Sequence, residues 1–164
     1  MKKIVFFSFL VAFSGTLKGQ TNELSLIKSR IVAELFANPV DDRQVTQALS
    51  HLKEDGSFDN IDYSDLSTTA SFPHGRHTSD LSQMAKAFNS PQSIHYKSPK
   101  VQDAIIRGLN YWVQKDYVGD NWHDNQITTP TNLVNLMLAM GNDLPTDLVS
   151  KAQPMINRAN MQAS

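Results

Sequence analysis

The spacing of apolar residues constrains the fold of this chain more than any other feature. Between residues 98 and 115 apolar residues recur every three or four positions, which places them on one face of an α-helix. This run follows Ser98-Pro99, a typical helix start, and its predicted inner face contains Val101, Ala104, Ile105, Gly108, Leu109 and Trp112. No segment after residue 20 alternates apolar and polar residues for long enough to form a β-strand. The sequence therefore predicts an all-α fold.

The other predicted helices repeat this spacing, and loops pair them with one another. The apolar residues that mark them are Leu24, Ile27, Ile31 and Leu35, which fall on one face; Val45, Ala48, Leu49 and Leu52; Leu81, Met84, Ala85 and Phe88; and Leu133, Leu136, Met137 and Met140. Helix ends are expected at Asn38-Pro39, Asp55-Gly56 and Gly141, since proline and glycine interrupt helices. Thr129-Pro130 repeats the start signature before the fifth helix, and a sixth begins near Pro145.

The amino-terminal residues have the pattern of a signal peptide. Lys2 and Lys3 precede an apolar stretch, residues 4–13, that is too short to span a bilayer, and Gly19 offers a small residue for cleavage. We expect a signal peptide at residues 1–19, a domain at 20–164, and a periplasmic or secreted protein; an uncleaved signal anchor is the alternative. No later run reaches the roughly twenty apolar residues of a membrane-spanning helix, so no membrane contact is expected after cleavage.

Composition restricts the partners. The chain has 164 residues, is 40% hydrophobic and carries a formal net charge of -1, which suits about one domain with its own core. No nucleic-acid partner is expected, because such proteins neutralise phosphates with clustered Lys and Arg side chains. The absence of cysteine excludes a disulfide.

The first polar loop, EDGSFDNIDYSD at residues 54–65, carries four closely spaced aspartates, at positions 55, 59, 62 and 65. A calcium loop needs a ligand at nearly every second position and a terminal glutamate. Ile61 and Tyr63 occupy ligand positions here, and no such glutamate follows. The favoured interpretation is a tight turn at Asp55-Gly56, with Phe58 and Ile61 packed into the core and the aspartates capping or facing water.

The second polar loop, GDNWHDNQITTPTNL at residues 119–133, combines an indole with several amide side chains. A sugar-binding surface needs such groups, because an indole face stacks on the apolar face of a sugar ring while amides bond its polar groups. Candidate substrate-binding residues are Trp122, His123, Asn125 and Gln126. The alternatives are a core anchor for Trp122, plain surface exposure for His123, and hydrogen bonding within the loop for the two amides.

Three motifs, DGSFDNIDYSD, GLNYWV and NWHDNQITTPTNLVNLMLAM, together resemble the N-terminal part of polysaccharide lyase family eight. This family includes the chondroitin, hyaluronan and xanthan lyases. Its loop typically reads Asn-Trp-Trp, a variable pair, Glu-Ile, a small residue and Thr-Pro. The chain departs from that pattern at His123 and Gln126 and matches it at Asn121, Trp122, Ile127, Thr129 and Pro130.

The resemblance implies a secreted enzyme whose paired antiparallel helices form part of an incomplete (α/α) toroid, followed by β-sandwich domains. Such enzymes cleave uronic-acid polysaccharides by β-elimination. A base removes the C5 proton, an acid assists the leaving oxygen, and an asparagine faces the sugar carboxylate as negative charge develops. In this family a histidine and a tyrosine handle the protons. The resemblance implies an acidic polysaccharide substrate and no cofactor.

The family's asparagine lies in a Thr-Gly-Ala-Asn motif, and the nearest match here is NRAN at residues 157–160. Asn160 is therefore the candidate catalytic residue; a helix-terminal asparagine is the alternative. Because the histidine-tyrosine region and the β-sandwich do not follow, we expect the front end of a lyase, inactive alone, whose partners are further C-terminal domains of the same polypeptide. The competing hypothesis is a non-catalytic glycan-binding or scaffold module.

Two histidines, His74 and His77, raise the possibility of a metal pair. The sequence offers no third ligand, and Pro73 and Gly75 favour a loop over a helix, so we expect an exposed turn and no metal. Tyr111 and Trp112 lie on or beside an apolar stripe and are predicted to be core residues.

Overall fold

The computed structural model describes residues 16–67 and 72–160, and their side chains from residue 23 onward. It separates into two compact units, residues 1–34 and 35–164. The first contributes helix α1 (Thr16–Leu35), which includes the predicted cleavage position after Gly19. Leu24, Ile27 and Ile31 lie on this helix, as the spacing predicts, and are exposed. Residues 1–15, which hold the apolar run of the expected signal peptide, lie outside the described residues.

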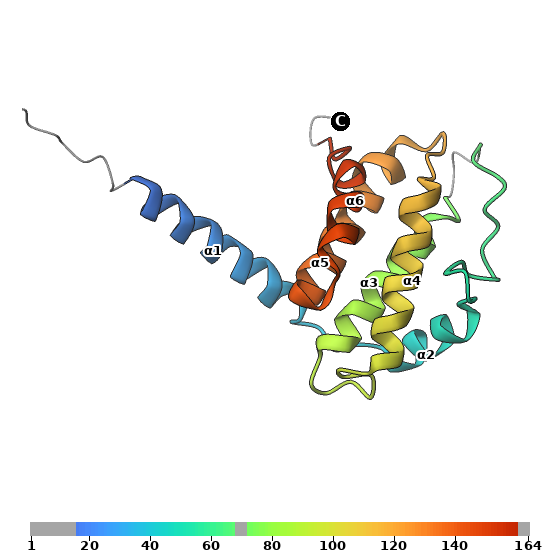
Figure 1. Cartoon of the computed structure of the whole chain (residues 1–164), viewed down its shortest axis with the longest axis horizontal. Coiled ribbons are helices and arrows are strands. Elements are labelled where there is room, and N and C mark those ends of the chain that lie inside the picture. The colour runs from blue at the N-terminus through green and yellow to red at the C-terminus, as the bar shows by residue number, and fades with distance from the viewer. Residues whose placement is uncertain (1–15, 68–71, 161–164) are drawn as a thin grey trace, which may run out of the picture. The chain divides into compact units, whose positions relative to one another are not determined.

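The second unit is helical throughout its regular parts (Figure 1). Its elements are α2 (Asp42–His51), α3 (Gly75–Asn89), α4 (Pro99–Lys115), the π-helical turn η1 (Asp124–Thr128), α5 (Thr129–Met140), the 3-10 turn η2 (Gly141–Asp143) and α6 (Thr146–Ile156). Across residues 16–67 and 72–160 the only extended pairing is an isolated bridge between Leu52 and Phe58. The all-α prediction is confirmed, and none of the described helices is long and apolar enough to cross a membrane.

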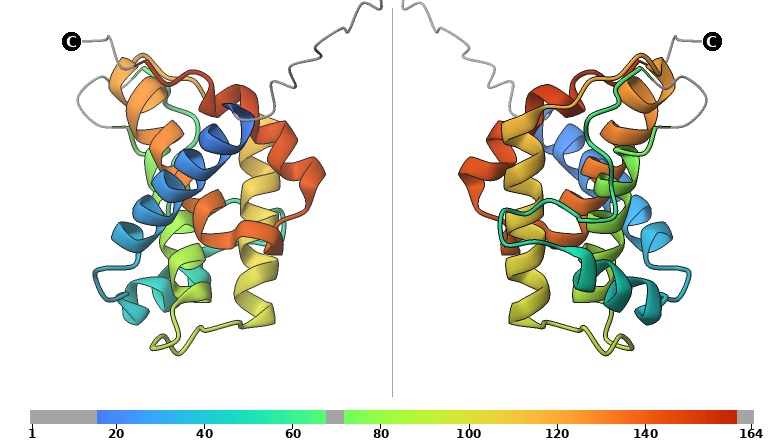
Figure 2. Two further views of the ribbon diagram at one scale, coloured as in Figure 1. Left: turned by 90° about the vertical axis from the view of Figure 1, so that its left-hand side faces the viewer. Right: turned by 90° about the vertical axis from the view of Figure 1, so that its right-hand side faces the viewer.

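Helix α3 organises the core by packing against α2, α4 and α5, while α6 packs on α4 and α5. Figure 2 shows the connection after α3 returning the chain so that α4 runs antiparallel beside it, as the paired-helix prediction requires. The predicted inner faces of α3 and α4 are buried, including Leu81, Met84, Ile105, Leu109 and Trp112. Leu133, Leu136 and Met140 of α5 complete this core.

The polar segment between α2 and α3 is stabilised by the packing and hydrogen bonds of its own side chains. Phe58 and Ile61 are buried in the core, as predicted. Each of three aspartates accepts hydrogen bonds from the backbone N–H and hydroxyl of the serine two residues later, in the pairs Asp55–Ser57, Asp62–Ser64 and Asp65–Ser67. These contacts confirm the capping interpretation for three of the four aspartates, while Oδ1 of Asp59 lies 2.7 Å from Nδ1 of His51.

Candidate functional site

The loop with the tryptophan becomes helical earlier than the sequence predicts. The Oδ1 atom of Asn121 accepts hydrogen bonds from the backbone N–H groups of His123 at 3.0 Å and Asp124 at 3.3 Å, so Asn121 caps a helix that starts at Trp122. The backbone N–H of Thr129 bonds to the carbonyl of Asp124 in the π-helical turn η1. Thr129-Pro130 therefore lies inside a continuous helical segment, and the prediction of a helix start there is wrong.

The earlier start of this helix has a physical cause, and it removes the anion site that a start at Thr129 would provide. Pro130 lacks an N–H and fits where the wider turn of η1 passes into α5. The unpaired N–H groups of the helix lie at its true start, and Asn121 already occupies two of them. The helix start is thus not an open anion site, contrary to what a start at Thr129 would provide.

Trp122 lies at the surface rather than in the core. It is 50% exposed, and its ring meets the His123 ring edge to face at 5.7 Å. The Nδ1 atom of His123 lies 3.2 Å from the hydroxyl oxygen of Thr128. The other tryptophan, Trp112, is 1% exposed and belongs to the core, as predicted. An exposed indole beside an exposed imidazole can contact a ligand without any rearrangement of the core.

Asn125 has a structural role within the loop. Its Nδ2 donates to the carbonyl of Gly119 at 2.6 Å, and its Oδ1 accepts from the N–H of Gly119 at 3.2 Å. Both functions of the carboxamide are therefore used to close the loop. The structure thus shows the alternative role of Asn125, which is hydrogen bonding within the loop.

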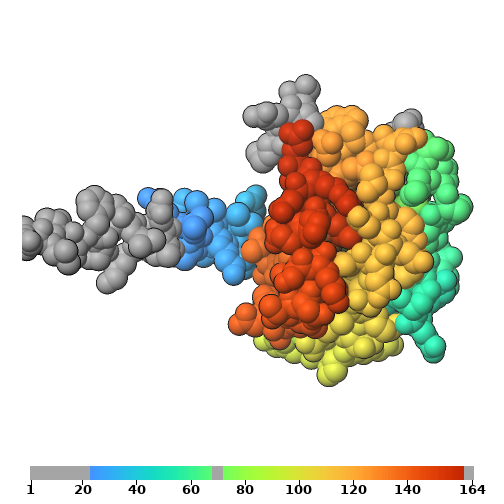
Figure 3. Space-filling view, turned by 45° about the horizontal axis from the view of Figure 1, so that its top comes forward, coloured from blue at the N-terminus to red at the C-terminus, as the bar shows by residue number. Residues whose placement is uncertain are grey.

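Gln126 and Asn160 come together although 34 positions separate them in the sequence. The backbone N–H of Asn160 donates to the carbonyl of Gln126 at 3.3 Å, and both residues line one groove of about 460 Å³. Figure 3 displays the end of α6 lying beside the segment that leads into α5. The groove has an aliphatic floor and uncharged polar groups, and its remaining lining residues are Ile127, Pro130, Thr131, Val134, Asn135, Ile156 and Ala159.

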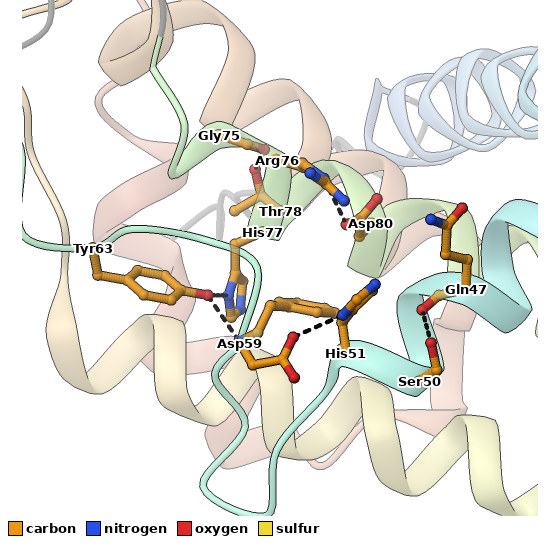
Figure 4. Close-up of polar contacts among 11 residues, drawn as sticks. Gln47, Ser50, His51, Asp59, Tyr63, Gly75, Arg76, His77, Thr78 and Asp80 are labelled. Atoms are coloured by element: carbon orange, nitrogen blue, oxygen red, sulfur yellow. Dashed lines mark hydrogen bonds and ion pairs between the residues drawn. The ribbon is translucent and has the colours of Figure 1, made fainter.

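His74 and His77 are fully buried, so the prediction of an exposed turn is wrong. Figure 4 shows the ring of His77 directed at the hydroxyl of Tyr63. Helix α3 begins at Gly75, which turns His77 inward against the rings of Phe58, Tyr111 and Trp112. Neutral imidazoles pack as aromatic rings, a property that the polarity of the motif PHGRH concealed. No group of three or more His, Cys, Asp or Glu residues able to hold a metal occurs in the described part of the chain.

The hydrogen bonds of His77 define the tautomer of its neutral ring. A carbonyl can only accept, so the Nε2–H of His77 donates to the Gly108 oxygen at 2.9 Å. In the neutral ring Nδ1 then accepts from the hydroxyl of Tyr63 at 2.8 Å, and the Tyr63 oxygen accepts from the Phe58 N–H at 3.1 Å. Burial lowers the pKa of His77 to about 4 and raises the pKa of Tyr63. These two groups are structural: His77 is fully buried and Tyr63 is partly buried against the core.

His74 is buried without a hydrogen-bond partner for either ring nitrogen. Its ring lies 4.7 Å from that of Phe72 and 5.2 Å from that of Tyr117. This aromatic cluster is not apparent from the sequence because its members come from three separate segments. The one signal that could have indicated it is the density of His, Tyr and Phe in residues 58–77 and 111–117.

Residues 32–162 match the family model described as polysaccharide lyase family 8, N terminal alpha-helical domain. The chain belongs to this family. This polysaccharide lyase family 8 domain is 31% identical over 139 residues to chondroitinase-AC of Pedobacter heparinus, covering 84% of this chain and 19% of that protein. It also matches the structure of a chondroitinase AC lyase, studied as enzyme-oligosaccharide complexes, with a TM-score of 0.74 and 28% identity over 83% of this chain and 21% of the other. The chain thus spans about a fifth of the length of both relatives. The predicted family and its toroid-type helical fold are confirmed.

Proposed function

We propose that this chain is exported and forms the N-terminal helical part of a lyase that cleaves uronic-acid polysaccharides by β-elimination. Within that enzyme it supplies a sugar-contacting surface formed by the Trp122 loop and the adjoining groove. The observation that carries the proposal is the exposure of Trp122, at 50%, on a domain of this family. An indole at the surface can stack on a ligand, and a pyranose ring presents the flat C–H face that suits it.

The groove residues supply the polar part of this contact. The side-chain amide of Gln126 makes no hydrogen bond to the described part of the chain and lines the groove, so it can bond a sugar hydroxyl or carboxylate. Asn160, at the same end of the groove, is the residue that we assign to the uronate carboxylate. A neutral amide donor there would stabilise the negative charge that develops when C5 loses its proton.

Proton transfer belongs elsewhere in the enzyme. The histidines in contact with tyrosines in the described residues, His74 and His77, are fully buried and cannot reach a substrate. We therefore assign the base and the acid to further domains of the same polypeptide. The same burial favours a second candidate function, a non-catalytic glycan-binding or scaffold module that uses the same surface.

Affinity electrophoresis tests the proposed surface. The full chain is run through gels that contain hyaluronan, chondroitin or xanthan, with dextran as the neutral control. We expect retardation by at least one acidic polysaccharide and its loss in Trp122→Ala. Tyr96→Ala is the matched control, because Tyr96 is 47% exposed and lies in the α3–α4 connection. Equal mobility in all gels, or equal retardation of both variants and the parent, would contradict the proposal.

A further inference from the structure

The start of the Trp122 loop is fixed by contacts with the segment that precedes α3. The backbone N–H of Asp120 donates to the carbonyl of Leu66 at 2.8 Å. Gly119 is pressed against the same carbonyl and the Phe72 ring, since a Cβ added to it would lie 2.9 Å from the Leu66 oxygen and 2.6 Å from the ring. The position of the loop therefore depends on the contacts that fix the backbone at Leu66.

Tyr63 holds that segment to the core. Its hydroxyl bonds both the Phe58 N–H and Nδ1 of His77, and its ring stacks on Tyr117 with centroids 5.2 Å apart and planes 27° apart. Tyr63 lies three residues before Leu66, and Tyr117 lies two residues before Gly119. One side chain thus contacts both chain segments that lead to the loop.

The bond between Tyr63 and His77 is directional. His77 commits its Nε2–H to the Gly108 carbonyl, so Nδ1 must accept and the tyrosine hydroxyl must donate. Gly108 itself is held against Leu81, because a Cβ at that position would lie 2.6 Å from a Leu81 methyl group. The hydroxyl of Tyr63 therefore points at a fixed acceptor in the packed interface of α3 and α4.

We infer that Tyr63 is a positioning residue for the Trp122 loop: its hydrogen bond to His77 fixes Leu66 and, through Asp120, the orientation in which Trp122 is presented. The inference rests on the proposed function for the meaning of that orientation to a sugar. The positional relationship itself holds with or without a ligand.

The test uses Tyr63→Phe, which keeps the ring and removes the hydroxyl. The chain has two tryptophans, so labelling with 5-fluorotryptophan yields two fluorine resonances, and Trp122→Phe assigns them. In Tyr63→Phe we expect the Trp122 resonance to shift or broaden. We also expect hydrogen exchange at the Asp120 amide to accelerate about tenfold, since its bond then opens locally. Affinity for a hyaluronan hexasaccharide should weaken several-fold.

Asn89→Ala is the matched control for general destabilisation. Asn89 also lies on α3 and donates a hydrogen bond to the Ala139 carbonyl at 2.7 Å, but it is twelve residues from His77, about 18 Å along the helix. We expect a comparable fall in Tm with no change at Trp122 or Asp120. If Tyr63→Phe does not fold, Asp120→Pro removes the amide proton at the other end of the path and should alter the Trp122 resonance in the same way.

The possible outcomes distinguish the positioning role of Tyr63 from the proposed function. If the Trp122 resonance and Asp120 exchange in Tyr63→Phe equal those in Asn89→Ala, or if Asp120→Pro leaves Trp122 unchanged, the inference is wrong. If the loop responds as expected but the parent chain binds none of the acidic polysaccharides, the positioning role stands and the proposed function fails.

Discussion

Asn125 bonds both backbone groups of Gly119 through one carboxamide, and this contact closes the loop that presents Trp122. The oxygen and one N–H of the Asn125 amide are thus engaged within the loop, which leaves this side chain less able than a free amide to orient a sugar. Its neighbour Gln126 has the same chemistry and lies in the groove. We therefore expect the adjacent amides to have separable roles, Asn125 in the loop and Gln126 at the proposed ligand surface.

Comparing Asn125→Ala with Gln126→Ala measures that separation. Asn125→Ala removes two hydrogen bonds and leaves two backbone groups of Gly119 without partners, so we expect a loss of about 1–3 kcal/mol in the free energy of unfolding. Gln126→Ala should change stability by less than about 0.5 kcal/mol and weaken glycan binding. Urea denaturation and a binding titration on each variant check both statements. Equal stability loss in the two variants would contradict the assignment.

Stability should fall as the pH is lowered from about 6.5 to about 4 because of His77. Its folded pKa, about 4, lies below the value of 6.5 for an exposed histidine, so the unfolded chain binds the proton more readily in this window. Above pH 6.5 the contribution of neutral His77 to the free energy of unfolding is fully present, and it amounts to about 3 kcal/mol. Burial of Asp80 acts in the opposite direction by raising its pKa, so it reduces the net slope.

His77→Gln provides the control for this pH dependence, because its Nε2 can still donate to the Gly108 carbonyl but does not titrate. Thermal denaturation of both proteins between pH 4 and 7 should yield a steep Tm profile for the parent and a shallower one for the variant. Parallel profiles would assign the acid sensitivity to other groups.

Gly56→Ala should destabilise the fold more than Gly141→Ala. Both glycines have positive φ, 88° and 54°, so an added Cβ strains the backbone at either position. A Cβ at Gly56 would also collide with the Arg107 carbonyl, whereas nothing lies within 4 Å at Gly141. We expect roughly 1–2 kcal/mol from strain at Gly141 and at least about 3 kcal/mol at Gly56, measured by chemical denaturation. Equal losses would contradict this expectation and would mean that residues 52–58 shift to relieve the contact with the Arg107 carbonyl.

The chain alone should not cleave polysaccharides. The histidines that contact tyrosines in the described residues, His74 and His77, are fully buried, so neither ring can reach a substrate proton. Incubating the purified chain with hyaluronan, chondroitin or xanthan should produce no absorbance from unsaturated uronate. Appearance of that absorbance, retained after repeated purification, would contradict this expectation.

Helix positions were predictable from the sequence because they follow from local spacing. Leu81, Met84, Leu109 and Trp112 fall on buried faces as their periodicity requires. The errors occur where a distant or unusual partner decides the outcome. Asn121 caps a helix that starts at Trp122, eight residues before Pro130, and a π-helical turn has no simple sequence signature.

Site residues were predictable as residue types and less so in their roles. The loop's exposed indole was identified, but only the fold distinguishes Asn125, which bonds Gly119, from Gln126, which lines the groove. The burial of His77 depends on Tyr63 and Gly108, which are 14 and 31 positions away. Local polarity cannot predict such long-range contacts.

The most direct test of the central claim follows the two tryptophan indole N–H signals in a nitrogen-15 correlation spectrum during titration with hyaluronan or chondroitin oligosaccharides. The proposed surface predicts that the Trp122 signal shifts progressively with the backbone signals of Gln126 and Asn160, while the signal of buried Trp112 stays in place. It also predicts that Trp122→Ala lowers affinity by about 1–3 kcal/mol, by analogy with aromatic stacking on planar ligands, without a change in Tm. Saturating oligosaccharide that leaves Trp122 unmoved, or a Trp122→Ala variant that binds as tightly as the parent, would contradict the account.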